Sequence, residues 1–341
     1  MLNFIKIDTS RYIWLDYVRF IGIFLVVWGH MCAAGTTINI IYSFHMPLFF
    51  VISGYLFSRK KHTSFLVFVK TKARQLLIPY VVFSVIAFLF WYFLILRIST
   101  VDFGAFTAAT LFWDFLSAQY IAYCLVLWFL PTLFLTECLY FIVSKWLSPL
   151  IVAIFFMALS FLYYHFVGED LFWSADIVLV AVVFYAFGAI LRQYGTKLLE
   201  SASKIPISVI GFTLCAVLVV VFAGITGRLD MLSRNYGELY MFYLAGVAGS
   251  MAIFFLGIIL ERIFGLVKVI SYLGANSLIV YGLHIQVMTL IGGTFRRLPG
   301  VENTILGQFV PSLIYAVVIM FVMIPVIYTI NRYTPKLVGK F

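Results

Sequence analysis

Three ionisable side chains, Asp16, Arg19 and His30, lie in a stretch whose other residues are almost all apolar. On a helix that turns about 100° per residue, the three fall within a sector of about 60° and share one face. The step from Arg19 to His30 then covers about 16 Å. A guanidinium can bind an anion at one end of this stripe, and an imidazole at the other end can act as the general base that activates a hydroxyl group.

Two more histidines fall in apolar segments. His45 stands in Tyr42-Ser43-Phe44-His45-Met46-Pro47, only a short connection after His30, so an antiparallel second helix places it at a similar depth. His284 reaches about the same level when residues are counted along a later helix. We therefore expect two or three imidazoles to line one cavity. Such a group could also hold a metal ion, but no carboxylate is expected at this level and no HxxxH spacing occurs, so we predict no metal.

The elements that position these side chains follow from the composition. Of 341 residues, 64% are hydrophobic and 11% are charged, whereas a soluble domain has about 45–50% apolar and about 25% charged residues. The chain is therefore predicted to be an all-α polytopic membrane helix bundle, with the whole of 1–341 forming a single integral membrane domain. We place ten transmembrane helices, at 13–34, 39–57, 76–98, 119–143, 149–167, 176–194, 205–225, 239–260, 269–292 and 306–330.

The charge distribution sets the orientation. Most Lys and Arg residues fall in 1–12, 58–75 and the other connections on that side, whereas the opposite rim holds only Arg97, Arg228, Arg234, Arg296 and Arg297. The positive-inside rule then places both termini in the cytoplasm of a multi-pass cell membrane protein, in a bacterial inner or plasma membrane. This rule also explains the net charge of +10, so the lipid bilayer is the expected partner and nucleic acid is not. The sequence leaves the oligomeric state open.

Less specific explanations remain open for several of these residues. Asp16 and Arg19 are also compatible with an i,i+3 ion pair that only neutralises itself. His30 is also compatible with a histidine that is hydrogen-bonded in the core. The basic loop 58–75 could bind phosphate or could only orient the chain and face lipid headgroups. Glu137 is explained as well by helix packing, or by a pair with that loop, as by catalysis.

Several motifs resemble those of a known family. They are Leu15-Asp16-Tyr17-Val18-Arg19, Val26-Val27-Trp28-Gly29-His30, and the run from Phe44 to Phe57 (FHMPLFFVISGYLF), followed by Lys70 to Tyr80, Trp128-Phe129-Leu130 and Gly274 to His284. Together they are similar to the acyltransferase 3 family of integral membrane O-acyltransferases, especially its fucose 4-O-acetylase-like branch. The combination of an Arg, a His in the same span and the FHMPLFF stretch in the next span is specific.

The resemblance implies an O-acetyltransferase that moves an acetyl group from cytoplasmic acetyl-CoA to a hydroxyl of a cell-surface or exported glycan, or of its lipid-linked precursor. It implies that His30 is the catalytic histidine and that Arg19, with the basic loop, holds the donor. The family often shows an Arg-x-x-Arg motif in this loop, whereas Thr71 stands three residues before Arg74 here. The predicted site residues are His30, Asp16 and His45 for catalysis, Arg19, Lys70, Lys72 and Arg74 for the donor, and His284, Ser53 and Trp128 for the acceptor.

The main alternative is a transporter or glycan flippase whose intramembrane charges form a permeation or proton path. Transporters often carry paired broken helices near the midplane, and the sequence shows no such pairing. A purely structural subunit would not need a stripe of Asp, Arg and His on one face.

Overall fold

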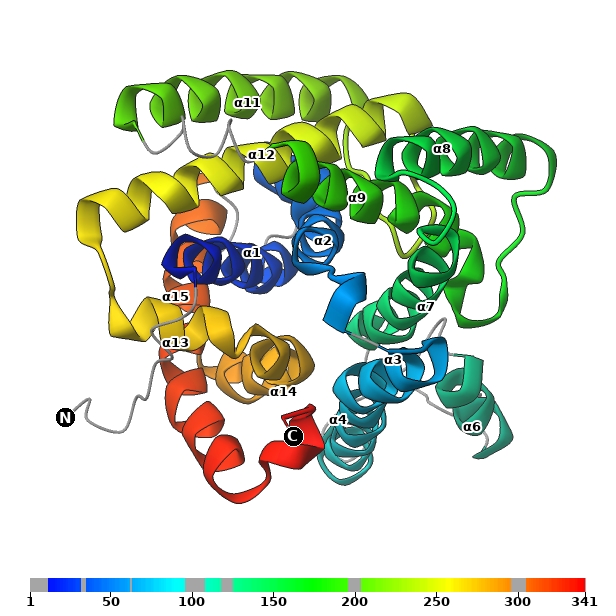
Figure 1. The fold of residues 1–341 in the computed structure, drawn as a ribbon. Helices are drawn as coiled ribbons and strands as arrows, with labels where there is room; N and C mark the ends of the chain where they lie inside the picture. Colours follow the sequence, from blue (N-terminus) through cyan, green and yellow to red (C-terminus); the bar gives the residue numbers. More distant parts are fainter. Residues whose placement is uncertain are drawn as a thin grey trace.

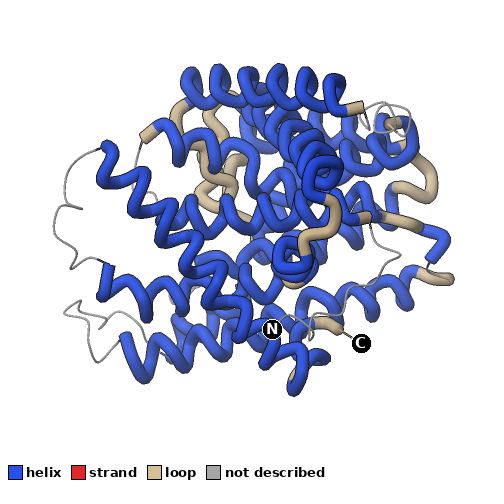
Figure 2. Tube along the Cα trace, turned by 90° about the vertical axis from the view of Figure 1, so that its left-hand side faces the viewer, coloured by secondary structure: helices blue, strands red, loops and turns tan. Residues whose placement is uncertain are grey.

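Long apolar helices cross one another in this protein, and every regular element in the part of the chain that the structure describes is helical (Figures 1 and 2). The computed structural model describes residues 12–31, 35–61, 63–95, 108–117, 125–195, 204–295 and 305–340. The α-helices are α1 (Ile13–Met31), α2 (Thr36–Leu56), α3 (Phe65–Lys72), α4 (Ile78–Phe90), α6 (Ala108–Ser117), α7 (Phe129–Val143), α8 (Pro149–Phe166), α9 (Ala175–Tyr194), α11 (Ile205–Thr226), α12 (Leu239–Phe264), α13 (Lys268–Ala275), α14 (Ser277–Phe295) and α15 (Ile305–Tyr333). The short 3₁₀ or π turns are η1 (Arg59–Lys61), η2 (Ala73–Leu77), η3 (Trp91–Ile95), η4 (Leu125–Trp128), η5 (Phe172–Ser174) and η6 (Pro335–Val338).

The number of membrane spans agrees with the sequence prediction. Within the described residues, 9 helical stretches are long and apolar enough to cross a bilayer, and α13 with α14 makes a tenth when the bent pair counts as one span. The prediction of an all-α polytopic membrane bundle of about ten helices is therefore confirmed. The first part of the predicted fourth span, 119–124, lies outside the described residues, and the described helical stretch there is Val126–Val143.

Glycines allow the central helices to approach closely. A Cβ atom on Gly54 of α2 would collide with the backbone of Tyr185 in α9, and a Cβ on Gly188 of α9 would collide with the carbonyl of Val51 in α2. Within a bilayer the hydrophobic effect does not drive helices together, so close van der Waals packing, which small residues allow, stabilises their contacts. The α2–α9 contact therefore holds α2, which carries His45, firmly in the bundle.

The prediction that 58–75 is a loop is wrong for its second half. A continuous helical stretch runs from Phe65 to Leu94, and the Ser64 hydroxyl accepts a hydrogen bond from the backbone N–H of Val67 at its start (3.3 Å). The Lys and Arg residues of this stretch do not end the helix, because their aliphatic stems can lie along it while their charged ends reach the interface. Pro79 lacks a backbone N–H, and the π turn η2 ends two residues before it, at Leu77.

The predicted ninth span, 269–292, is not one straight helix. It is bent by 85° between α13 and α14, at Asn276. The side-chain amide of Asn276 donates to the carbonyl of Tyr272 (2.7 Å), while its backbone carbonyl accepts from the N–H of Ile279 (2.9 Å). Asn competes with the helical backbone in this way and is favoured at helix starts. The break therefore ends α13 and begins α14 at a single residue.

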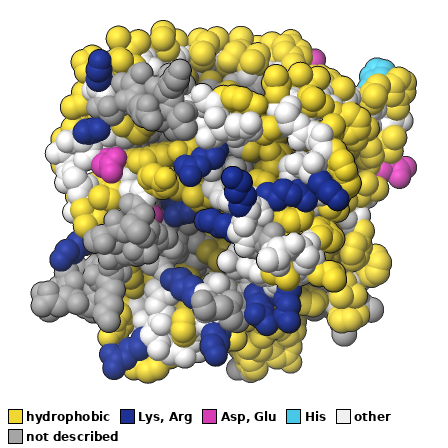
Figure 3. Space-filling model, viewed as in Figure 1, with side chains coloured by type: hydrophobic (Ala, Val, Ile, Leu, Met, Phe, Trp, Pro, Cys, Tyr) yellow, Lys and Arg dark blue, Asp and Glu magenta, His cyan; other side chains and the backbone are white. Residues whose placement is uncertain are grey.

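Both ends of the described chain lie on one face of the bundle. Gly274, beside the break, packs against the backbone of Asp16 near the start of α1, and Lys340 donates a hydrogen bond to Asn276 Oδ1 at the same break. Figure 3 shows this face, on which many Lys and Arg side chains gather with few acidic ones among them. The positive-inside rule assigns this face to the cytoplasm.

Candidate active site

Three imidazoles from different helices meet beyond the middle of the bundle. His30 lies in the last turn of α1, and its ring centroid is 5.3 Å from that of His284 in α14. The ring of Tyr42 in α2 lies 6.4 Å from His30 and 4.8 Å from His45. The structure thus brings together the three histidines that the sequence placed at one depth, with Tyr42 between two of them.

Hydrogen bonds to the backbone fix which ring nitrogen carries the proton in two of these histidines. Nδ1 of His45 donates to the carbonyl of Ile41 (2.8 Å), and Nδ1 of His284 donates to the carbonyl of Tyr281 (2.8 Å). A carbonyl can only accept, so both neutral rings must present Nε2 as an acceptor. Nε2 of His284 is buried and has no hydrogen-bond partner among the described residues. This nitrogen is therefore available for a proton-bearing group of a substrate.

A cation covers the outer side of this cluster. The guanidinium carbon of Arg228 lies 4.6 Å from the centre of the Tyr42 ring, within the range of a cation–π contact. Arg228 also pairs with Asp230 at 3.7 Å, and its side chain remains half exposed. A positive group with access to the outside thus lies one ring away from His30 and His45.

The short loop between α11 and α12 that carries Arg228 is held by polar contacts. Asp230 and Asn235 exchange two backbone hydrogen bonds (2.8 and 3.0 Å), and the Asn235 amide donates to the carbonyl of Arg228 (2.9 Å). Arg234 binds the fully buried carboxylate of Asp176 with two nitrogens (2.9 and 3.1 Å). A bidentate pair of this kind adds geometric specificity as well as energy. The loop therefore presents Arg228 in a defined place.

The sequence prediction missed Arg228 and Tyr42 as site residues. Tyr42 stands in the quoted stretch with His45, three residues earlier on the same helix, and this i,i+3 spacing was the available signal. The sequence identifies Arg228 only as one of the few cations on the outer rim. Its approach to Tyr42 depends on the path of the α11–α12 loop, which no local pattern indicates.

Near the start of α1, Asp16 and Arg19 form the i,i+3 ion pair that the sequence allowed. The distance from Arg19 Nη1 to Asp16 Oδ1 is 3.4 Å, and the Asp16 side chain is only 2% exposed. The helical rise places Asp16 about 21 Å from His30 along α1. The structure therefore does not bring Asp16 to the histidines, and its contact is with Arg19.

Three of the four basic residues predicted to hold the donor, Lys70, Lys72 and Arg74, lie on the helical stretch α3–η2. Lys70 and Arg74 are exposed, whereas Lys72 extends to α7 and pairs with Glu137 at 2.8 Å. Glu137 is almost fully buried. The pair between Glu137 and the basic segment, one of the alternatives at the sequence level, is thus present.

The remaining predicted acceptor residues lie apart from the histidines. Ser53 is half-buried on α2, about 12 Å along the helix from His45. Trp128 is 5% exposed and its ring packs edge-on against Phe129, which in turn contacts Phe50. Trp128 therefore forms part of the apolar packing of the described residues, and a contact between Trp128 or Ser53 and an acceptor stays a prediction.

The described residues contain no group of three or more His, Cys, Asp or Glu side chains placed to hold a metal ion. In two histidines of the cluster, Nδ1 donates to a backbone carbonyl, which leaves Nε2 as a hydrogen-bond acceptor. The absence of a metal stays a prediction.

The fold and this cluster define a class, that of polytopic membrane proteins with reactive side chains inside the helix bundle. The chain matches the acyltransferase domain of the acyltransferase 3 family over residues 12–332 and belongs to that family. It is therefore a multi-pass membrane acyltransferase. No curated protein and no solved structure matched the chain.

Proposed function

We propose that this acyltransferase moves an acetyl group from cytoplasmic acetyl-CoA to a hydroxyl of a cell-surface or exported glycan, or of its lipid-linked precursor, in a bacterial inner or plasma membrane. The observation that carries the proposal is the contact of His30 with His284, whose Nε2 is buried without a partner among the described residues. An unpartnered imidazole nitrogen beside His30 is suited to accept a hydrogen bond from a hydroxyl of the acceptor and to position it for His30.

In the proposed reaction, His30 is the general base. Its imidazole takes the proton of the acceptor hydroxyl as the hydroxyl oxygen attacks the thioester carbonyl. The new C–O bond forms, the C–S bond breaks, and the departing CoA thiolate receives the proton from the imidazolium. Nε2 of His284 and Nε2 of His45 act as hydrogen-bond acceptors in this proposal, because Nδ1 of each ring donates to the backbone. They accept from neighbouring hydroxyl groups of the sugar and so hold the reacting hydroxyl beside His30.

The donor enters from the cytoplasmic face in this proposal. Arg19 is one-fifth exposed and lies on the same helix as His30, about 16 Å away. A guanidinium is suited to bind the phosphates of CoA, and Lys70, Lys72 and Arg74 add positive charge on α3–η2. The donor, with its phosphates at Arg19, would then extend along α1 and place its thioester beside His30. Asp16 acts through Arg19, whose side chain it orients.

The acceptor enters from the opposite side. The half-exposed Arg228 and the Tyr42 ring beneath it form the outer lip of the histidine cluster. A sugar can stack on an aromatic ring and can donate its hydroxyl groups to nearby imidazoles. We therefore add Tyr42 and Arg228 to the proposed acceptor residues.

The proposal is tested with the purified full chain reconstituted in vesicles. Acetyl-CoA and the envelope glycan of the source cell are supplied, and free CoA and glycan ester groups are measured together. The wild type should release CoA and form esters in equal amounts. His30→Ala should lose both by a factor of about 10² to 10⁴, the usual contribution of a general base. His165→Ala, which changes an exposed histidine on α8, is the matched control and should retain both.

The alternative of a transporter makes a different prediction in the same vesicles. The break at Asn276 is a feature that transporters also use, but they pair such breaks, and the described residues contain 1 bent pair. Movement of glycan across the vesicle membrane without release of CoA would favour the transporter and would refute the proposed acetyl transfer.

A further inference from the structure

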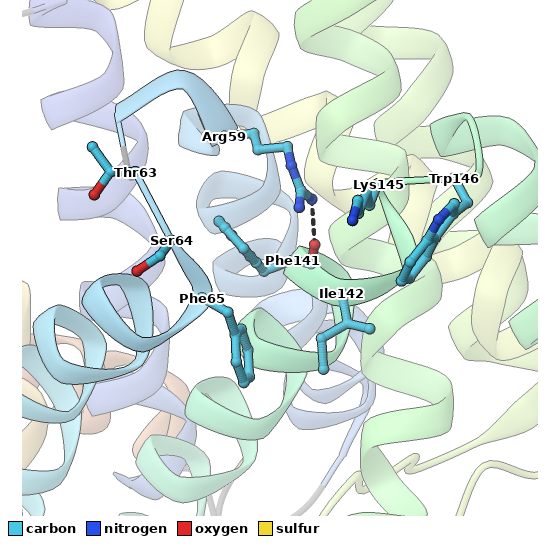
Figure 4. A pocket seen from close by; sticks show the side chains of 8 residues that line it. All are labelled: Arg59, Thr63, Ser64, Phe65, Phe141, Ile142, Lys145 and Trp146. Atoms are coloured by element: carbon cyan, nitrogen blue, oxygen red, sulfur yellow. Dashed lines mark hydrogen bonds between the residues drawn. The ribbon is translucent and has the colours of Figure 1, made fainter.

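A pocket lies on the cytoplasmic face, far from the histidine cluster (Figure 4). It has a volume of about 470 Å³ and lies between η1, the start of α3 and the end of α7. Arg59 in η1 follows the end of α2 at Leu56, whereas His45 lies near the middle of α2, about 16 Å along the helix from that end. The lining residues are Arg59, Thr63, Ser64, Phe65, Phe141, Ile142, Lys145 and Trp146.

Two cations meet in this pocket. Figure 4 shows the nitrogen ends of Arg59 and Lys145 directed toward the same part of it. Arg59 Nη1 donates to the carbonyl of Phe141 and to Ser144 Oγ (3.3 Å), and its guanidinium carbon lies 4.3 Å from the centre of the Phe141 ring. These contacts hold the guanidinium in place.

The guanidinium keeps donors for a ligand. A guanidinium has five N–H donors, and the two hydrogen bonds of Arg59 both leave from Nη1. The described residues that line the pocket include no acid. An anion in this pocket would therefore meet the N–H groups of Nε and Nη2 together with the ammonium of Lys145.

The rim of the pocket is apolar and faces outward. Phe65, Ile142 and Trp146 are 39%, 41% and 69% exposed, although each is a large hydrophobic side chain. The exposed apolar surface continues along α8 at Leu150 and Ile151. Trp side chains are enriched at the level of lipid headgroups, where one end of the ring is apolar and the other is polar. Cations inside and apolar side chains outside match an amphiphile with an anionic head.

We infer that this pocket binds the phosphate headgroup of an anionic phospholipid from the cytoplasmic leaflet. The phosphate lies between Arg59 and Lys145, and the acyl chains follow Ile142 and the exposed face of α8 into the bilayer. Arg and Lys close to the membrane surface attract anionic lipids, and the planar guanidinium suits the phosphate oxygens. The apolar rim favours a lipid over free phosphate. The site is independent of the proposed acetyl transfer.

The test uses the full chain, delipidated in a neutral detergent, with bound lipid counted by native mass spectrometry. A short-chain phosphatidylglycerol should bind with at least about tenfold higher affinity than the matching phosphatidylcholine. Arg59→Gln with Lys145→Gln should weaken phosphatidylglycerol binding about thirtyfold, and Lys145→Gln alone about fivefold. The single variant leaves the contacts of Arg59 with α7 intact, so it tests the site even if the double variant folds poorly.

The control variant Lys60→Gln with Lys61→Gln removes two exposed charges from the same turn without touching the lining. It should bind phosphatidylglycerol as the wild type does. Equal weakening in the control would show general surface attraction and would overturn the inference. Competition by millimolar inorganic phosphate would assign the pocket to a free ion, and competition by acetyl-CoA would assign it to the donor. Either result would also overturn the lipid assignment, while acetyl transfer is measured separately.

Discussion

The imidazole rings of His30 and His284 lie 5.3 Å apart, centre to centre, with an angle of 40° between their planes. His30 lies in the last turn of α1, and His284 lies on α14, which begins at the break in the ninth span. Packing of α1 against both α13 and α14 fixes this distance. The two imidazoles therefore form one unit whose geometry depends on a contact between opposite ends of the chain.

Replacing His284 should impair the same step as replacing His30. We expect His284→Leu to lower kcat by a factor of about 10², because Leu has no hydrogen-bond acceptor to place beside His30. Residues that act as a unit are strongly non-additive, so the double variant with His30→Ala should be no slower than His30→Ala alone. Single-turnover release of CoA is the measurement. Losses that multiply in the double variant would show that the two imidazoles act independently.

Arg228 should influence the acceptor and not the donor. We expect Arg228→Gln to raise KM for the acceptor about fivefold, as the loss of one exposed hydrogen bond between the guanidinium and an acceptor hydroxyl, worth about 1 kcal/mol, would. Arg228→Lys keeps the charge and should have a smaller effect. The temperature of unfolding should stay unchanged in both, because an exposed ion pair such as that with Asp230 contributes little. If KM rose for acetyl-CoA and not for the acceptor, Arg228 and Tyr42 would not form the outer lip of the histidine cluster.

The sequence was sufficient for the depth of the histidines. Counting residues from the ends of apolar segments placed His30, His45 and His284 at one level, because the rise per residue of a membrane helix is nearly constant. The same regularity of apolar segments predicts the number of spans. Local sequence patterns do not predict the contact between Tyr42 and Arg228, because this contact depends on how α2 packs beside the α11–α12 loop.

Two features of the fold escaped prediction for local reasons. The basic residues of α3 favour a loop at the level of the sequence, although their aliphatic stems can follow a helix, so the start of α3 at Phe65 is not predicted. The segment around Asn276 is apolar enough overall to predict one continuous span, although Gly274, Asn276 and Ser277 favour a helix end. The stability of the break comes from distant partners, since Asn331 donates to Asn276 Oδ1 (2.9 Å) and Lys340 donates to the same oxygen.

Variants of the Lys72–Glu137 pair can distinguish a structural role of Lys72 from a role in binding the donor. Glu137 Oε1 accepts from Lys72 at 2.8 Å, whereas Oε2 is buried without a hydrogen-bond partner among the described residues. Glu137→Ala should therefore lower the free energy of unfolding by about 2 kcal/mol, a value between those of exposed and buried pairs, since Lys72 is partly exposed. Thermal unfolding in detergent measures this loss.

Replacing both partners should restore stability, because an apolar pair of similar volume has no unpaired buried charge. Lys72→Met with Glu137→Leu is the matched variant. If Lys72 also contacts the donor phosphates, this stable double variant should still show a KM for acetyl-CoA raised several-fold. A stable double variant with an unchanged KM would limit Lys72 to its pair with Glu137 and would leave donor binding to Arg19, Lys70 and Arg74.

Gly274 should tolerate no side chain, because a Cβ there would collide with the carbonyl of Asp16. Gly274→Ala must push α13 away from α1, which costs about 1–3 kcal/mol of stability and moves the Asp16–Arg19 pair relative to the break. We expect a lower unfolding temperature and a higher KM for acetyl-CoA. Gly224→Ala in α11 is the matched control, since no heavy atom lies within 4 Å of its Cβ position. That change should be neutral or slightly stabilising, because Ala favours helix over Gly. Equal unfolding temperatures for the two variants would show that the α1–α13 contact can accommodate the added methyl group. The close approach at Gly274 would then not fix the position of Asp16 and Arg19.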